Sequence, residues 1–223
     1  MSFKNKVKGF IDNISSKLRT RTTAIEHVIK INNQYIDTEL TLIKDSQEGI
    51  IALKNYADTE SIELENAISS LKLTFKGIEA LKREKIEKLR KKFIIPLQEI
   101  LDDYNALTVK LNEADKAEKA AERLRIKYDR KKTKKSQEGL EETEFLLREA
   151  QDKYELLSTE VKEITESLSK EKINKLLTIL TDRIDIEKFF SEKSVELIKS
   201  ILDRYKTLEN EEDLGLKIET FKE

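Results

Sequence analysis

Apolar residues recur along two stretches of the chain in alternating steps of three and four residues. The first stretch covers residues 97–128 and the second covers residues 140–168. This spacing is the period of α-helices that pack as coiled coils, so the sequence predicts two long helices with one apolar seam each. The seam residues are Leu97, Ile100, Leu101, Tyr104, Leu107, Leu111, Ala114, Ala117, Ala121, Leu124 and Tyr128 in the first stretch, and Leu140, Thr143, Leu147, Ala150, Tyr154, Leu157, Val161, Ile164 and Leu168 in the second.

A short polar break separates the two seams. Residues 134–139 read KKSQEG, which is short enough to join the two helices as an antiparallel hairpin. A basic cluster at residues 130–135 would then lie at the tip of this hairpin.

Two further apolar stripes extend the helical prediction to the remaining chain. One runs from Ile25 to Ala57, and the other runs from Ile173 to Leu208 after a loss of register near residues 169–172. That loss of register suggests a bend or a change of packing partner.

A single helix is expected between the first stripe and the hairpin, from about Ser61 to Lys134. At ~1.5 Å per residue it would be on the order of 110 Å long. Pro96 lies inside it and cannot donate a backbone hydrogen bond, so a kink is expected there.

The predicted fold is therefore all-α, with three long kinked antiparallel helices forming a coiled-coil protomer. Residues 173–208 are apolar on more than one side and include Phe189, Phe190 and Tyr205. An exposed patch of this kind usually marks a protein interface. A symmetric homodimer is the simplest way to bury it.

Composition agrees with a helical chain. Its 223 residues include one proline, five glycines and no cysteine, and 39% of them are charged. Strand and turn residues are scarce, and disulfides and thiol chemistry are excluded. No apolar run approaches the ~20 residues that span a bilayer, and no secretion signal begins the chain. We expect a cytoplasmic protein.

Charge is segregated although the net charge is only −1. Residues 116–135 hold ten Lys or Arg against three acids, whereas residues 138–163 hold nine acids against three basic residues. Residues 1–21 hold six basic residues and one acid. Such segregation creates local fields that the net charge hides, although long solvated helices are often charged as well.

The first 19 residues have the pattern of an amphipathic helix that lies in a membrane interface. Its cationic residues fall outside the apolar face. An ordinary packing helix is the alternative. The residues expected to insert are Phe3, Val7, Phe10, Ile11, Ile14 and Leu18.

Four segments, in order, resemble the BAR domain family, and the whole chain most resembles its N-BAR subgroup of amphiphysins and endophilins. They are residues 93–97 (FIIPL), 123–129 (RLRIKYD), 141–155 (EETEFLLREAQDKYE) and 189–193 (FFSEK). Lys127 stands where the family often has an acid, and the late histidine of the family is absent.

The resemblance implies a crescent-shaped antiparallel homodimer that binds anionic membrane and senses or generates curvature as a peripheral membrane protein. Residues 1–19 would be the inserting helix, residues 20–208 the BAR domain and residues 209–223 an acidic tail. The predicted membrane-binding residues are Arg123, Arg125, Lys127, Arg130, Lys131, Lys132, Lys134 and Lys135.

Two other functions compete with membrane binding. The first is a coiled-coil tether or adaptor that contacts only proteins. The second is a nucleic-acid binder, because basic helices neutralise phosphate. The sequence contains no motif that reads bases, and the adjacent acidic arm would repel DNA, so no nucleic-acid partner is expected.

Catalysis has little support in the sequence. The single histidine, His27, lies in a helical run and is expected at a surface or interface. The chain contains no glycine-rich phosphate loop and no metal-ligand spacing. We expect neither an enzyme nor a bound metal or cofactor.

Overall fold

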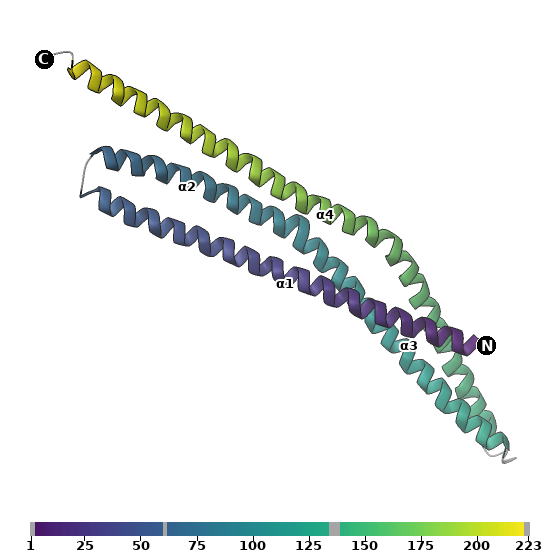
Figure 1. Ribbon diagram of the computed structural model, residues 1–223. Coiled ribbons are helices and arrows are strands. Elements are labelled where there is room, and N and C mark those ends of the chain that lie inside the picture. The colour runs from purple at the N-terminus through teal and green to yellow at the C-terminus, as the bar shows by residue number, and fades with distance from the viewer. Residues whose placement is uncertain (1–2, 60–61, 134–138, 221–223) are drawn as a thin grey trace. The chain divides into compact units, whose positions relative to one another are not determined.

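The computed structural model describes the backbone of residues 3–59, 62–133 and 139–220. Within these ranges, it describes the side chains of all residues except 3–13, 62–67, 70, 168–170 and 204–220. Apart from turns at residues 58–59 and 139, every residue of the described backbone is helical. The helices are α1 (Phe3–Ala57), α2 (Ile62–Leu89), the π-helix η1 (Arg90–Ile94), α3 (Ile95–Thr133) and α4 (Leu140–Thr220) (Figure 1).

The predicted long helices are confirmed. Because α2, η1 and α3 follow one another without a gap, they form one helical run from Ile62 to Thr133. The contacts divide the chain into two compact units, which we describe separately. Unit 1 contains Met1–Ile29 and Pro96–Thr178, and unit 2 contains Lys30–Ile95 and Ile179–Glu223.

In unit 1, α3 and α4 form the antiparallel pair that the two seams predicted (Figure 1). The first seam is buried up to Ala117 and becomes half-buried toward the hairpin. The chain thus buries one stripe per helix, as expected for coiled-coil packing. The buried residues of unit 1 include Leu97, Ile100, Leu101, Tyr104, Leu107, Leu111, Ala114 and Ala117 from α3, Leu147 and Val161 from α4, and Leu18 and Ile29 from α1.

Lys172 explains the loss of register in the third long helix. It is 4% exposed and replaces an apolar residue in the core of unit 1. Its Nζ lies 3.3 Å from Asp103 Oδ2 and donates to the carbonyl of Ile100 at 3.3 Å. The ammonium also lies 4.0 Å from the ring centroid of Tyr104. Burial lowers the pKa of Lys172, and Asp103 opposes this shift only in part.

In unit 2, α1 contributes a seam with a strict seven-residue repeat, and α2 and α4 contribute matching apolar residues. The repeat keeps the same face of α1 against its neighbours. The buried residues are Ile36, Ile43, Ile50 and Ala57 from α1, Ile68, Ile86 and Leu89 from α2, Phe93 from η1, and Ile179 and Ile186 from α4.

The π-helix ends at Ile94, two residues before Pro96. The N–H of Ile95 bonds to the carbonyl of Arg90, five residues earlier, where an α-helix would use four. Proline has no N–H, and its ring crowds the carbonyl four residues back. A wide turn relieves this conflict locally, as π-bulges commonly do in long helices.

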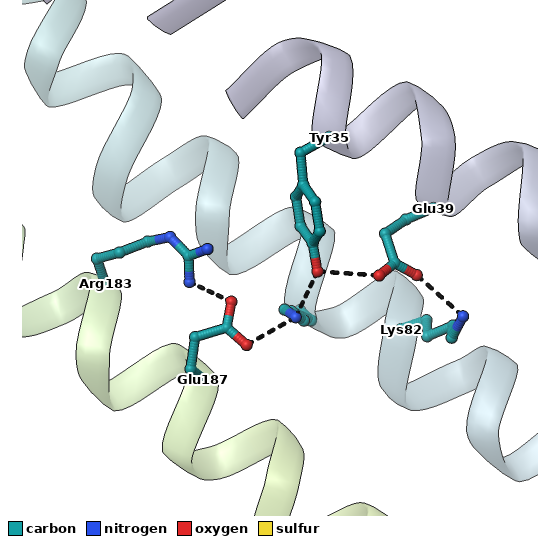
Figure 2. A network of polar contacts seen from close by, with 6 residues as sticks. Tyr35, Glu39, Lys82, Arg183 and Glu187 are labelled. Carbon is teal, nitrogen blue, oxygen red and sulfur yellow. Dashed lines mark hydrogen bonds and ion pairs between the residues drawn. The ribbon is translucent and has the colours of Figure 1, made fainter. Parts of the chain in front are cut away.

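A polar layer crosses the apolar core of unit 2 (Figure 2). Lys85, which is 4% exposed, donates from Nζ to Tyr35 Oη at 2.6 Å and pairs with Glu187 Oε2 at 2.8 Å. The Tyr35 hydroxyl donates to Glu39 at 2.9 Å, and Glu39 also pairs with Lys82 at 2.9 Å. The layer therefore joins α1, α2 and α4.

The partners of the layer keep its charged groups ionised. Burial would raise the pKa of Glu187, but hydrogen bonds from Lys85 and Arg183 outweigh burial and lower it. The pKa of Glu39 is lowered in the same way by Lys82 and Tyr35. Burial would lower the pKa of Lys85, yet Glu187 and Tyr35 raise it. A protonated Lys85 is a structural cation and no nucleophile.

These directions predict how stability depends on pH. A carboxylate whose pKa is lowered by folding stabilises the fold above its ordinary value of 4.5, and this contribution is lost as the pH falls through the lowered value. The melting temperature of the intact chain should therefore exceed that of Glu187→Gln at neutral pH, with the difference shrinking below about pH 4.5. Protein concentration must be held constant, because association also shifts melting.

The control for this experiment is Glu48→Gln, which removes the charge from an exposed pair with Lys44. Exposed pairs of this kind contribute roughly 0.3–0.5 kcal/mol, so its melting temperature should stay near that of the intact chain. A constant difference between the intact chain and Glu187→Gln at all pH values would contradict the prediction.

Candidate membrane-binding surface

Six of the eight basic residues predicted at the hairpin tip lie within the described part of α3. The other two, Lys134 and Lys135, lie outside the described residues. The six are Arg123, Arg125, Lys127, Arg130, Lys131 and Lys132.

Three of these side chains have partners within the hairpin. Arg125 Nε lies 4.0 Å from Asp129 Oδ2, and the Lys132 ammonium lies 5.7 Å from the Tyr128 ring centroid. Lys131 Nζ donates to the carbonyl of Gly139 at 2.9 Å and thereby ties α3 to the start of α4. These residues hold local structure, so their charge is partly engaged.

The other three are exposed and form a line along α3. Arg123, Lys127 and Arg130 follow one another at steps of four and three residues, which places them on one helix face. Lys116 lies seven residues before Arg123 and extends the same face. Among the described residues, none of these four has a carboxylate partner. We call Lys116, Arg123, Lys127 and Arg130 the basic stripe.

Helix dipoles account for only part of this charge. Arg130 lies in the last turn of α3, where a cation is favoured by the helix dipole. Lys116, Arg123 and Lys127 lie more than one turn from that end, beyond the reach of the effect. The helix dipole therefore does not account for the position of these three residues.

Two carboxylates of α4 in unit 1 pair with cations outside the basic stripe. Glu160 pairs with Lys110 at 3.2 Å and is the main cause of the raised pKa of Lys110. Glu144 pairs with Arg148 on α4 itself at 2.7 Å. These two carboxylates of the acidic arm thus compensate cations other than those of the basic stripe.

Sequence reasoning identified the stripe only in part. It selected all basic residues near the tip, although the four-residue spacing of Arg125 and Asp129 indicated a pair. It omitted Lys116, although the seven-residue spacing to Arg123 was available as a signal.

The N-terminal segment is continuous with the rest of α1, so the helix does not end at residue 19. Leu18 is 4% exposed, and a bilayer could not reach it in this conformation. Ile14 is half-buried. The side chains of Phe3, Val7, Phe10 and Ile11 lie outside the described residues, and their insertion into a membrane stays a prediction.

The predicted boundary at residue 208 likewise falls inside a helix, because α4 continues to Thr220. His27 is exposed, as expected for a surface histidine. Within the described residues, no three potential ligands gather around a metal position. None of the described helices is both long and apolar enough to cross a bilayer.

Two solved structures share this fold over nearly the whole chain. The amphiphysin BAR domain from Drosophila matches with a TM-score of 0.74 and 17% identity, over 91% of this chain and 95% of that chain. The N-terminal I-BAR domain of D. discoideum IBARa matches with a TM-score of 0.55 and 15% identity, over 92% and 91%. No protein-family model and no curated protein matches the sequence.

The coiled-coil fold of the chain is thus that of BAR domains, and the predicted fold class is confirmed. Assignment to the N-BAR subgroup stays a prediction, because an I-BAR domain matches as well.

The turn at the hairpin tip gives a testable prediction for stability. Gly139 has φ +66°, and a Cβ there would lie 2.8 Å from Lys131 Nζ. Gly139→Ala should lower the free energy of unfolding by about 1–2 kcal/mol, because the left-handed conformation is strained for alanine. Urea denaturation followed by circular dichroism measures this change.

Gly49→Ala is the matched control. Gly49 lies inside α1, and a Cβ there would meet no atom within 4 Å. The substitution should stabilise the chain by roughly 0.5–1 kcal/mol, because alanine is the better helix former. Equal effects of the two substitutions would rule out the special role of the tip turn.

Proposed function

We propose that this chain is a dimeric scaffold that binds anionic membrane and senses or generates curvature. The observation that carries the proposal is the basic stripe, an uncompensated line of cations on a protein with the BAR fold. The amphiphysin and I-BAR structures are named for the same domain type, which supports this reading.

The electrostatic argument needs no binding pocket. Each Lys or Arg near an anionic leaflet contributes about 1 kcal/mol, and salt weakens this contribution. Four such residues per protomer, doubled in a dimer, suffice for peripheral binding. An anionic membrane surface can also contact all the cations of the basic stripe at once, because they share one helix face.

Exposed apolar residues of unit 2 support the dimer. Large aliphatic side chains on α4 are 45–68% exposed, and α1 carries a similar row. Soluble proteins rarely leave so much apolar surface in water, and a second copy of the chain could cover it in a symmetric interface. The residues are Leu180, Ile184, Val195, Ile198 and Leu202 on α4, and Ile31, Leu42, Leu53 and Tyr56 on α1.

The N-terminal segment would add a second membrane contact, a helix that inserts between lipids and acts as a wedge. We propose that the residues before Ile14 insert their apolar face in the outer leaflet, as their amphipathic pattern indicates. The basic stripe would set the affinity for charged lipid, and the wedge would promote bending.

Cosedimentation with anionic liposomes tests the basic stripe. The triple variant Arg123→Ala, Lys127→Ala, Arg130→Ala should bind at least about tenfold more weakly, because three contributions of about 1 kcal/mol are lost. The matched control Lys119→Ala, Arg125→Ala, Lys132→Ala removes the same charge from engaged side chains and should bind much more tightly than the stripe variant. Equal loss in both triple variants would show that only total charge matters.

A salt series on the intact chain separates the alternatives. Membrane binding through the stripe weakens steadily as salt rises. A protein-only tether would bind no liposomes at any salt concentration, and this outcome would remove the proposed function.

Light scattering tests the dimer. The intact chain should have about twice the 26.0 kDa protomer mass, and Ile184→Asp with Ile198→Asp should return it to one protomer mass. Both residues are exposed, so circular dichroism should show retained helicity. An intact chain that stays monomeric at micromolar concentration would contradict the dimer.

Phe10→Glu tests the wedge. The variant should tubulate anionic vesicles much less than the intact chain while its dimer mass is unchanged, because a carboxylate replaces an apolar residue on the inserting face. Asn5→Glu adds the same charge outside that face and serves as the control. If Phe10→Glu tubulates vesicles as well as the intact chain, the wedge is unnecessary.

A further inference from the structure

The part of α1 that belongs to unit 1 is held mainly by one buried side chain. Among the described residues from Ile14 to Val28, Leu18 alone is buried, at 4% exposed. Ile14 and Ile25 share its helix face and are half-buried. The rest of unit 1 is Pro96–Thr178, so the pair of α3 and α4 supplies the surface that covers Leu18.

The seam of α1 becomes polar in this part of the helix. Buried residues recur every seven positions from Ala57 back to Ile29. The next two positions of that repeat are Thr22, which is half-buried, and Ser15, which is exposed. Thr22 Oγ1 donates to the carbonyl of Leu18 at 3.1 Å, so its hydroxyl is satisfied within α1. The seam that holds α1 in unit 2 therefore weakens before Ile29.

Polar contacts show the same contrast between the two parts of α1. In unit 2, Tyr35 and Glu39 bond to two lysines of α2. Within the described residues 14–27, no side chain forms a hydrogen bond or ion pair with another helix, and the hydroxyl of Thr20 bonds to a carbonyl of α1 itself. Local unfolding begins where few buried contacts hold a segment. This part of α1 is therefore easier to release than the part in unit 2.

The face that packs on unit 1 is also the face predicted to insert into a membrane. Ile14 and Leu18 belong to the predicted inserting residues, and unit 1 covers both at least in part. A side chain cannot be covered by unit 1 and lie among acyl chains at the same time. Packing and insertion therefore exclude each other for these two residues.

We propose that residues 14–24 are a releasable segment whose apolar face either packs on unit 1 or inserts into an anionic bilayer. While it is packed, the segment restrains the wedge. Lys17, Arg19 and Arg21 are exposed in the packed state, so they can contact anionic lipid before Leu18 is released. This inference rests on the proposed function and adds a restraint that the bilayer itself removes.

Hydrogen exchange and vesicle tubulation test the release. Thr20→Gly with Thr23→Gly places two poor helix formers on the exposed side of α1, outside its apolar face. The amides of residues 14–24 should then exchange at least about tenfold faster in solution, because each glycine favours opening of the helix. The full-length variant should also tubulate vesicles of phosphatidylserine and phosphatidylcholine in equal parts at a lower protein-to-lipid ratio than the intact chain.

Thr38→Gly with Thr41→Gly is the matched control. It replaces two exposed threonines of α1 at the same spacing, within the part that the polar layer holds in unit 2. This variant should exchange the amides of residues 14–24, and tubulate vesicles, like the intact chain.

Cosedimentation of the intact chain with the same vesicles tests the proposed function separately. An intact chain that binds no vesicles would remove the proposed function, and this inference with it. If the intact chain binds, but the Thr20 and Thr23 variant exchanges faster and tubulates only at the same or a higher ratio, packing on unit 1 does not restrain the wedge. Exchange in residues 14–24 of the intact chain as slow as in residues 33–50 would show that no releasable segment exists.

Discussion

A long helix in this protein can bury only one narrow stripe, and this constraint governs the rest of the structure. Ile29, Ile36, Ile43, Ile50 and Ala57 follow one another at intervals of seven residues along α1. Each fully buried isoleucine contributes about 1.5–3 kcal/mol, so a few residues per turn stabilise the fold. The other faces of each helix do not pack in the core. Charged side chains are tolerated there, and 39% of the residues are charged.

A repeating seam has one weakness, which is that it packs almost as well after a shift of seven residues. The polar layer around Lys85 removes this ambiguity in unit 2. The Lys85 ammonium contacts both Tyr35 and Glu187 in only one alignment of α1, α2 and α4. Any other alignment would leave a buried charge without partners. Buried polar groups fix register in coiled coils by the same means.

The sequence predicted those features that depend on local period. The seam from Leu97 to Ala117 and the hairpin after Thr133 both follow from spacing and a short polar break, and both are present. The polar layer was not predicted, because Tyr35 and Lys85 are fifty residues apart and only packing brings them together. The division of the basic cluster depends on packing only for Lys131, which reaches Gly139 across the hairpin turn. The partners of Arg125 and Lys132 lie four residues away, at Asp129 and Tyr128, so their spacing in the sequence already indicated them.

The π-helix before Pro96 can also be understood by counting. Buried residues run Ile86, Leu89, Phe93 and Leu97, so two steps of four follow one another across the π-helix. The hydrogen bond from Ile95 to Arg90 spans one residue more than an α-helical bond does. The wide turn holds this extra residue within a single turn. The extra residue therefore stands beside the only proline of the chain, where regular α-helical hydrogen bonding is interrupted in any case.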